Sequence, residues 1–192
     1  MSDLLCRICE DKDLRIHLVY GTADNFTGHI IYDHPDFSGK VFYLHEDAYN
    51  CFQKARQFAR EMGYGFLVYD GFRPTQAQER LWSFCPDPQY LAPPEKGSPH
   101  SRAIAIDLTL TDDHGEPLDM GTPFDAFDPQ SHHSATGLSS HVQKNRAILA
   151  GIMVRSGWTW YENEWWHYQL PNSTSYNLLS QDLLPEKIVF IK

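Results

Sequence analysis

Apolar residues recur at helical spacing in three stretches of the chain. The first stretch runs over Asp47–Met62 and is followed by Gly63, and its apolar positions are Ala48, Cys51, Phe52, Ala55, Phe58, Ala59 and Met62. Apolar residues three and four positions apart place one face of a helix against a core, and a glycine commonly follows the last turn. The same reasoning predicts a short helix over Thr75–Phe84 and a longer one over Ser139–Ser156.

Alternation of bulky and small residues predicts strands elsewhere. Over residues 103–110 one face carries Ile104, Ile106, Leu108 and Leu110, and the other carries Ala103, Ala105, Asp107 and Thr109. This alternation indicates a half-buried strand whose bulky face packs into a core and whose small face leaves room around Asp107. Further strands are predicted over Phe66–Tyr69, Trp158–Tyr161, Trp165–Leu170 and Lys187–Ile191, the middle two as a hairpin and the last as an edge strand.

The predicted elements define a fold class. Turns are expected at Asp70–Pro74 and Asp112–Gly115, and residues 119–137 form a long loop rich in Gly, Pro, Asp and His. Helices beside a mostly antiparallel central sheet make an α+β fold. The 192 residues are enough for one domain with a substantial core, so we predict a single domain over residues 1–192.

The charge of the chain limits its partners. The formal net charge is -9 and the sequence pI is about 5.5, which disfavours nucleic acid and anionic membranes as partners. No apolar stretch approaches the roughly 20 residues of a transmembrane helix, and the N-terminal residues lack the basic and apolar regions of a signal peptide. We therefore expect a cytoplasmic protein with a small-molecule partner, and the sequence leaves open whether it forms a homo-oligomer.

The four cysteines are Cys6, Cys9, Cys51 and Cys85. The Cys6-x-x-Cys9 pair is half of a zinc ribbon, but a ribbon needs a second pair at suitable spacing, and Cys51 and Cys85 stand alone. Free thiols in a reducing compartment are the expectation.

Two separated segments carry candidate metal chemistry. The first is Gly97–Asp107, with His100 and Asp107, and the second is Glu164–His167. Two histidines and one aspartate can hold a catalytic zinc and leave the fourth position to water, and a nearby carboxylate such as Glu164 can take a proton from that water. His100 lies an odd seven residues before Asp107, so on one straight strand the two would point to opposite faces. His100 is therefore predicted in the loop that precedes the strand.

Each half of this pattern is weak alone, but together the halves resemble a known family. Ser-x-His-x6-Asp followed by Glu-x-Trp-His is similar to the signature of the zinc D-alanyl-D-alanine dipeptidases, which are associated with vancomycin resistance and share a fold with zinc D,D-carboxypeptidases and the Hedgehog signalling domain. The resemblance continues through nearly the whole chain, in order, at Tyr20–Gly28, Asp70–Pro74, Cys85–Tyr90, Ile106–Leu110, Asp119–Gly121, Phe124-Asp125 and Glu164–Tyr168.

The chain departs from the family pattern at one position. Where the family usually has glycine after Ser-Arg, this chain has Ala103. If that position requires a positive φ or very close backbone packing, alanine would strain it. Because a methyl group is a small intrusion, we expect activity to survive.

The resemblance implies a role for each matching residue. His100, Asp107 and His167 would bind one zinc ion per chain, and Glu164 would be the general base. Arg73 would stabilise the oxyanion, although by itself it would be read as a turn arginine paired with Asp70. The substrate-binding residues would be Asp125 at the substrate ammonium, Tyr20 beside it, and Ser98 near the substrate backbone or carboxylate. The adjacent His132 and His133 are interpreted as loop surface, since the zinc ligands are already complete.

The sequence thus predicts zinc-dependent hydrolysis of D-Ala-D-Ala to two D-alanines. One alternative is a D,D-carboxypeptidase or cell-wall endopeptidase acting on longer peptides, against which the ammonium site at Asp125 argues. A second is a zinc-binding interaction module that has lost catalysis. Glu164 and Arg73 argue against this module, because a purely structural zinc needs neither.

Overall fold

The computed structural model describes residues 5–32, 37, 41–180 and 188–189. Its strands are β1 (Leu5–Cys9), β2 (Leu14–Ile16), β3 (Val41–His45), β4 (Gly65–Asp70), β5 (Ala105–Thr111), β6 (Thr159–Tyr161), β7 (Glu164–Gln169) and β8 (Ile188–Val189). Its α-helices are α1 (Glu46–Glu61), α2 (Thr75–Phe84) and α3 (Ser140–Arg155). Short 3-10 turns include η1 (Val19–Gly21), η3 (His100–Arg102), η4 (Pro129–Ser131) and η5 (Ser173–Ser175).

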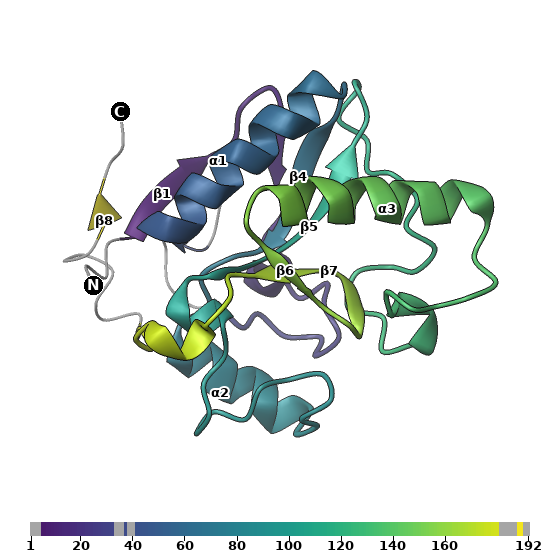
Figure 1. Cartoon of the computed structure of the whole chain (residues 1–192). Coiled ribbons are helices and arrows are strands. Elements are labelled where there is room, and N and C mark those ends of the chain that lie inside the picture. The colour runs from purple at the N-terminus through teal and green to yellow at the C-terminus, as the bar shows by residue number, and fades with distance from the viewer. Residues whose placement is uncertain (1–4, 33–36, 38–40, 181–187, 190–192) are drawn as a thin grey trace.

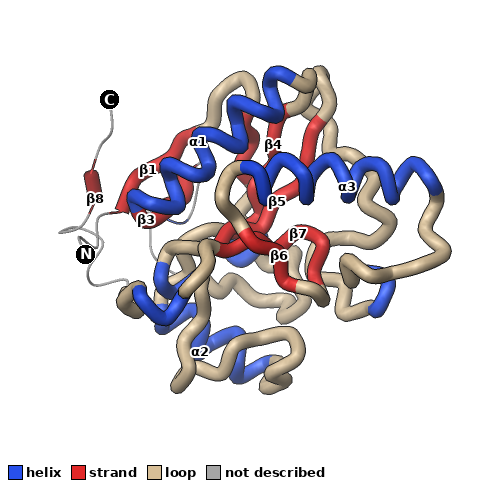
Figure 2. Tube along the Cα trace, viewed as in Figure 1, coloured by secondary structure: helices blue, strands red, loops and turns tan. Residues whose placement is uncertain are grey.

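The strands form two sheets. The larger has the order β2-β4-β5-β7-β6, and the smaller has the order β3-β1-β8. Within the larger sheet only β2 and β4 are parallel, which confirms the predicted α+β class with a mostly antiparallel sheet. Figures 1 and 2 show α1 and α3 on one side of the strands and α2 on the other.

The three predicted helices are present within one residue of their expected bounds. Ser139 caps α3, since its hydroxyl accepts a hydrogen bond from the Val142 backbone at 3.2 Å. Such a cap satisfies one of the backbone donors that the first turn leaves free. In α1 the same role falls to His45, whose Nδ1 accepts from the Asp47 backbone N–H.

Strand β5 corrects one expectation from the sequence. All seven of its residues are buried, so the strand is covered on both faces and is not half-buried. It lies between β4 and β7 at the centre of the sheet. On its second face Asp107 lines a pocket, and Ala105 and Thr109 are buried because segments distant in sequence close over them.

Three strands in the first 45 residues, β1, β2 and β3, were not predicted from the sequence. At the other end, the predicted strand Lys187–Ile191 is described only at Ile188–Val189, which pair in parallel with β1. The remaining residues of that prediction lie outside the described residues. Within the part of the chain that the structure describes, no helix combines the length and apolarity needed to cross a bilayer.

Register places functional residues in one row across the sheet. A bulge between Val68 and Asp70 in β4 brings Asp70 opposite Asp107 of β5, and Asp107 in turn lies opposite His167 of β7. Three polar residues from three neighbouring strands therefore meet near the end of β4, where the chain turns toward Arg73.

Candidate active site

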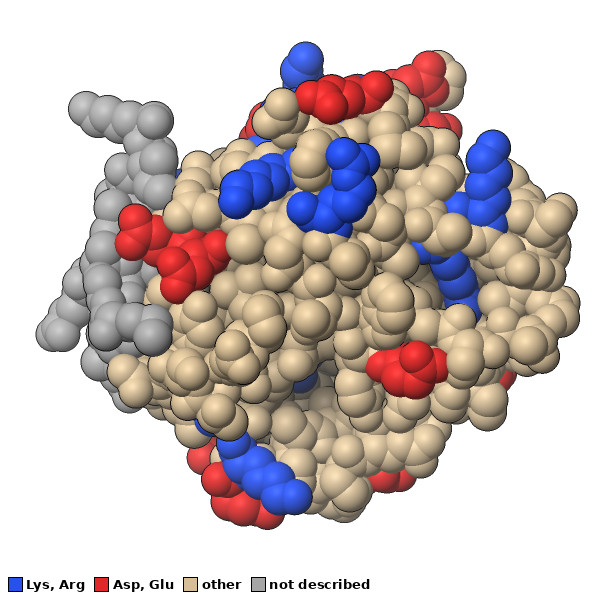
Figure 3. Space-filling model, in the orientation of Figure 1, with Lys and Arg blue, Asp and Glu red and all other residues tan. Residues whose placement is uncertain are grey.

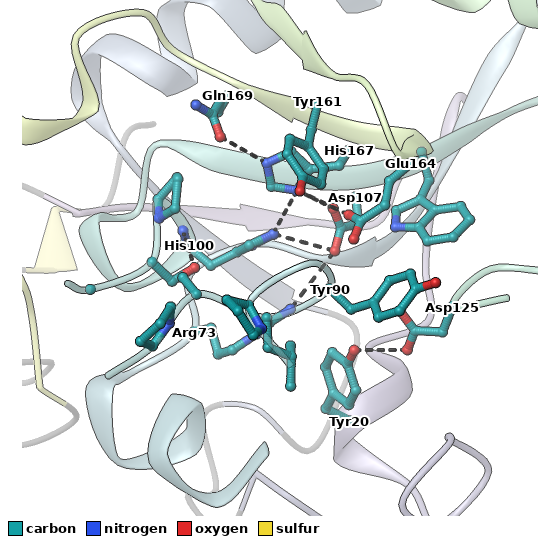
Figure 4. A pocket seen from close by; sticks show the side chains of 18 of the residues that line it. Tyr20, Arg73, Tyr90, His100, Asp107, Asp125, Tyr161, Glu164, His167 and Gln169 are labelled. Carbon is teal, nitrogen blue, oxygen red and sulfur yellow. Dashed lines mark hydrogen bonds and ion pairs between the residues drawn. The ribbon is translucent and has the colours of Figure 1, made fainter. Parts of the chain in front are cut away.

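A pocket of about 400 Å³ opens beside this row. It is lined by the segments around Tyr20, Arg73, Tyr90–His100, Asp125–Phe127 and Tyr161–Gln169. Figure 3 shows a hollow near the centre of the face that it presents, and Figure 4 shows the side chains that line the pocket. The walls come from loops and strand ends that are far apart in the sequence, so only folding assembles them.

His100, Asp107 and His167 converge in this pocket. All three are buried, and each offers a ligand atom within 4.8 Å of the others. His167 Nδ1 lies 3.0 Å from Asp107 Oδ1 and 3.1 Å from His100 Nε2, while His100 Nε2 lies 3.3 Å from Asp107 Oδ2. His100 begins the 3-10 turn η3, as the odd spacing from Asp107 required.

The outer nitrogens of both histidines have partners that orient the rings. His100 Nδ1 lies 2.8 Å from the Gly71 carbonyl oxygen, which can only accept, and His167 Nε2 lies 3.1 Å from Oε1 of Gln169. Donation at these outer nitrogens leaves lone pairs on the inner ones. Three lone-pair atoms, two nitrogens and a carboxylate oxygen, then face one another, and a cation is the group that satisfies them together.

The donor set fits zinc, which favours imidazole nitrogen and carboxylate oxygen and commonly keeps one open position in catalytic sites. Outer hydrogen bonds of the kind made by Gly71 and Gln169 are typical of metal-binding histidines. When protons instead of a metal occupy the inner nitrogens, the charge and hydrogen bonds of His100 and His167 hold the pKa of Asp107 well below its ordinary value, although burial by itself would raise it. The carboxylate is therefore ionised and able to serve as a ligand.

Glu164 begins β7, immediately after the hairpin turn, and its side chain reaches back toward the three ligands. Its Oε2 lies 3.9 Å from His167 Nδ1, and the side chain is 14% exposed. Burial raises the pKa of Glu164 to about 8; His167 and Arg73 oppose this shift, and Asp107 and Asp125 add to it. A carboxyl group that titrates near neutral pH can both accept and return a proton.

Arg73 is buried below the ligands and held by a fixed network. Its Nε and Nη2 donate to Asp70 Oδ2 at 2.9 and 2.7 Å, and its Nη1 donates to Gln78 Oε1 at 3.0 Å. Tyr32 donates to the other oxygen of Asp70 at 2.5 Å. The pairing with Asp70 that a turn arginine would make is present, yet Arg73 also lines the pocket, with Nη2 3.9 Å from Asp107 Oδ2.

Asp125 and Tyr20 lie together at one end of the pocket. The Tyr20 hydroxyl donates to Asp125 Oδ2 at 2.7 Å, and the Tyr20 ring also lies against the Arg73 guanidinium at 4.9 Å. Burial raises the pKa of Asp125 to about 7, against the lowering effects of the Tyr20 hydrogen bond and of Arg73. Figure 4 shows Asp125 and His100 on opposite sides of Asp107. Ser98 lines the wall beside His100, and its Oγ accepts from the His100 backbone at 3.2 Å.

Ala103 adopts the conformation that favours glycine. Its φ of 56° and ψ of 26° are left-handed, and it is fully buried after the turn that holds His100. A non-glycine residue in this region costs about 1 kcal/mol or more. Two backbone hydrogen bonds hold Ala103 in this conformation. The Ala103 N–H donates to the His100 carbonyl, and the Ala103 carbonyl accepts from the His45 N–H.

The sequence interpretation missed some pocket residues and misplaced two histidines. Gln169 follows His167 by two positions, so strand periodicity alone puts it on the same face. His132 and His133 are half-buried, not on the loop surface: the His133 ring stacks on Trp160 with centroids 5.1 Å apart, and burial lowers its pKa to about 4. Neither contributes to the His100–Asp107–His167 cluster.

Comparison with known proteins places the chain in a family. Residues 8–186 match the Peptidase M15 family, described as D-ala-D-ala dipeptidase. The chain is 44% identical over 168 residues to the D-alanyl-D-alanine dipeptidase of Escherichia coli (strain K12), covering 88% of this chain and 84% of the relative. It is 37% identical over 178 residues to that of Enterococcus faecium, covering 80% and 87%. Among solved structures, VanYB in complex with D-Alanine-D-Alanine is similar with a TM-score of 0.45 and 16% identity, over 69% of this chain and 74% of that chain.

A buried metal-ligand cluster next to a carboxyl group of raised pKa, on a chain with these relatives, defines a metallopeptidase. The chain belongs to the D-Ala-D-Ala dipeptidase family of Peptidase M15 enzymes, which confirms the resemblance seen in the sequence.

Proposed function

We propose that the chain, as one domain over residues 1–192, hydrolyses D-Ala-D-Ala to two D-alanines with one zinc ion. The observation that carries this proposal is the convergence of three lone-pair donors, Glu164 and Asp125 in one pocket of about 400 Å³. Bound by His100, Asp107 and His167, zinc supplies Lewis acidity, which lowers the pKa of a water and polarises the scissile carbonyl.

Glu164 carries the proton in this mechanism. It accepts a proton from the attacking water and then returns it to the leaving amine of the second alanine. Its place beside His167, in a pocket that raises its pKa, supports this role. Arg73 keeps N–H groups beyond those bound by Asp70 and Gln78, and these are aimed at the negative charge that develops on the carbonyl oxygen.

Asp125 sets the length of the substrate. Its carboxylate binds the free ammonium of the dipeptide, and Tyr20 holds that carboxylate by a hydrogen bond. A blocked or extended N-terminus leaves the carboxylate unpaired and places bulk against the end of the pocket. This recognition favours a dipeptidase over a carboxypeptidase that acts on longer wall peptides.

Asp125→Asn tests the length selection. Asparagine tolerates a positive φ, and residue 125 has a φ of 58°, so the backbone is expected to be retained. We expect wild-type protein to cleave D-Ala-D-Ala well and N-acetyl-D-Ala-D-Ala at least about a hundredfold less efficiently, since a buried charge left unpaired costs several kcal/mol. In Asp125→Asn the kcat/KM for D-Ala-D-Ala should fall. The ratio of this kcat/KM to the kcat/KM for N-acetyl-D-Ala-D-Ala should also become smaller than in wild-type protein. Equal rates on both substrates in wild-type protein would instead indicate a carboxypeptidase.

Arg73→Lys tests the oxyanion role while keeping a positive charge beside buried Asp70. Lysine lacks the planar fork that reaches Asp70, Gln78 and the substrate at once. Removal of one oxyanion donor typically lowers kcat by about 10²–10³-fold, and we expect a fall in that range with a smaller change in KM. Steady-state kinetics at matched zinc content decide this, with a thermal melt to check the fold. A change confined to KM would make Arg73 a ground-state binding residue.

A further inference from the structure

Carboxylate side chains outnumber lysine and arginine side chains along the pocket. Its carboxylates are Asp107, Asp125 and Glu164, and its cationic side chains other than histidine are Arg73 and Lys96. Asp70 and Gln78 hold the guanidinium of Arg73, and its remaining N–H groups serve the oxyanion in the proposed function. Within the described residues, Lys96 makes no ion pair or side-chain hydrogen bond, and its acidic neighbour Glu95 does not line the pocket.

Lys96 lines the pocket on the segment that leads to His100, and Asp125 lines it from a different segment. Lys96 precedes Gly97-Ser98-Pro99, which lines the pocket beside His100, and His100 and Asp125 lie on opposite sides of Asp107 (Figure 4). A dipeptide whose ammonium meets Asp125 and whose scissile bond lies at the metal ligands extends its carboxylate toward the wall that carries Lys96. Two extended residues span roughly 7 Å, so the two charged ends cannot share one end of the pocket.

The backbone that carries Lys96 is fixed. The Lys96 N–H donates to the Pro93 carbonyl at 3.0 Å, and Arg102 Nη2 donates to the Lys96 carbonyl at 3.3 Å. Gly97 follows with a φ of 75°, and a Cβ on it would lie 2.4 Å from the Leu178 side chain. The close packing on Gly97 holds this segment of the wall in place, while the Lys96 side chain itself is exposed at the pocket.

We propose that Lys96 binds the free carboxylate of the dipeptide substrate and, with Asp125 at the other end, restricts the enzyme to zwitterionic dipeptides. The unpaired ammonium of Lys96 attracts the free carboxylate of an entering dipeptide, as the carboxylate of Asp125 attracts its ammonium. Lys96 is thus a specificity-determining residue, and peptides amidated or extended at the C-terminus are poor substrates. This inference rests on the proposed hydrolysis of D-Ala-D-Ala.

The test compares D-Ala-D-Ala with D-Ala-D-alaninamide, which lacks the carboxylate. The proteins are wild type, Lys96→Ala, Lys96→Arg and the matched control Lys144→Ala, which removes an exposed lysine of α3 that does not line the pocket. A hydrogen bond to a charged group predicts that Lys96→Ala raises the KM for D-Ala-D-Ala about tenfold with little change in kcat. For the amide, Lys96→Ala and wild type should be equal. Lys96→Arg should restore most of the affinity, and Lys144→Ala should match wild type.

Two outcomes overturn the assignment. In the first, Lys96→Ala leaves the KM for D-Ala-D-Ala unchanged. In the second, Lys96→Ala raises the KM for D-Ala-D-Ala and the KM for D-Ala-D-alaninamide by the same factor. Absence of wild-type turnover is a separate result, which rejects the proposed function. Calorimetric titration of wild type and Lys96→Ala with D-Ala-D-Ala then still measures whether Lys96 contributes to binding of the carboxylate.

Discussion

Glu164→Gln is expected to abolish most of the turnover of D-Ala-D-Ala while the protein keeps its fold and its zinc. Glutamine has nearly the shape of glutamate and can still hydrogen-bond, but it cannot accept the proton of the attacking water. A positioned general base contributes typically about 10²–10⁴-fold, so kcat should fall by that factor. Release of D-alanine measures the rate, and elemental analysis of the same sample measures the metal.

Glu162→Gln is the matched control for this variant. Glu162 lies two residues earlier on the same hairpin, is exposed, and accepts a hydrogen bond from the Ser134 backbone at 2.9 Å, away from the pocket lining. We expect it to retain near wild-type kcat. A zinc-loaded Glu164→Gln protein with kcat within about threefold of wild type would place the base elsewhere, because so small a loss lies below the usual contribution of a general base.

His167→Ala is expected to lose nearly all bound zinc and, with it, nearly all activity. The substitution leaves only His100 and Asp107 as ligands, and catalytic zinc sites typically need three from the protein. Zinc per chain, measured after dialysis, should fall from about one to less than about a tenth. His100→Ala should behave in the same way, because Nε2 of His100 lies 3.1 Å from His167 Nδ1 and 3.3 Å from Asp107 Oδ2.

The control for metal loss is His114→Ala, which removes a histidine whose side chain is 81% exposed on the turn after β5. This variant should bind zinc as wild type does. Thermal unfolding of His167→Ala should resemble that of wild-type protein stripped with a chelator, because both lack the stabilisation that a bound metal gives the folded state. Full zinc occupancy in both His100→Ala and His167→Ala would contradict the assignment of the ligands.

The local sequence pattern was sufficient to predict those elements in which buried positions recur at regular spacing over many residues. The helices α1, α2 and α3 were predictable because each offers ten or more positions at helical spacing and a clear end signal. The strands near the N-terminus were not predicted. β2 has three residues, too few to show a period, and Val41–His45 is a nearly continuous apolar run that periodicity cannot assign.

The sequence by itself also determined the chemistry that is available. The family motifs supplied two imidazoles, a carboxylate ligand, a second carboxylate and an arginine, and the expected turn at His100 followed from its odd separation from Asp107. These conclusions depend on residue type and short-range spacing, both of which are local properties.

Only the tertiary structure decided how these groups meet. The register of β5 against β7 puts Asp107 opposite His167, and the outer partners Gly71 and Gln169 turn two ring nitrogens inward. Burial of both faces of β5, the left-handed backbone of Ala103 and the contact of Tyr20 with Asp125 depend on segments distant along the chain. The sequence therefore determined which groups could act. Packing between remote segments set their distances, their orientation and the pKa values of the buried carboxyl groups, because each of these depends on neighbours that sequence spacing does not reveal.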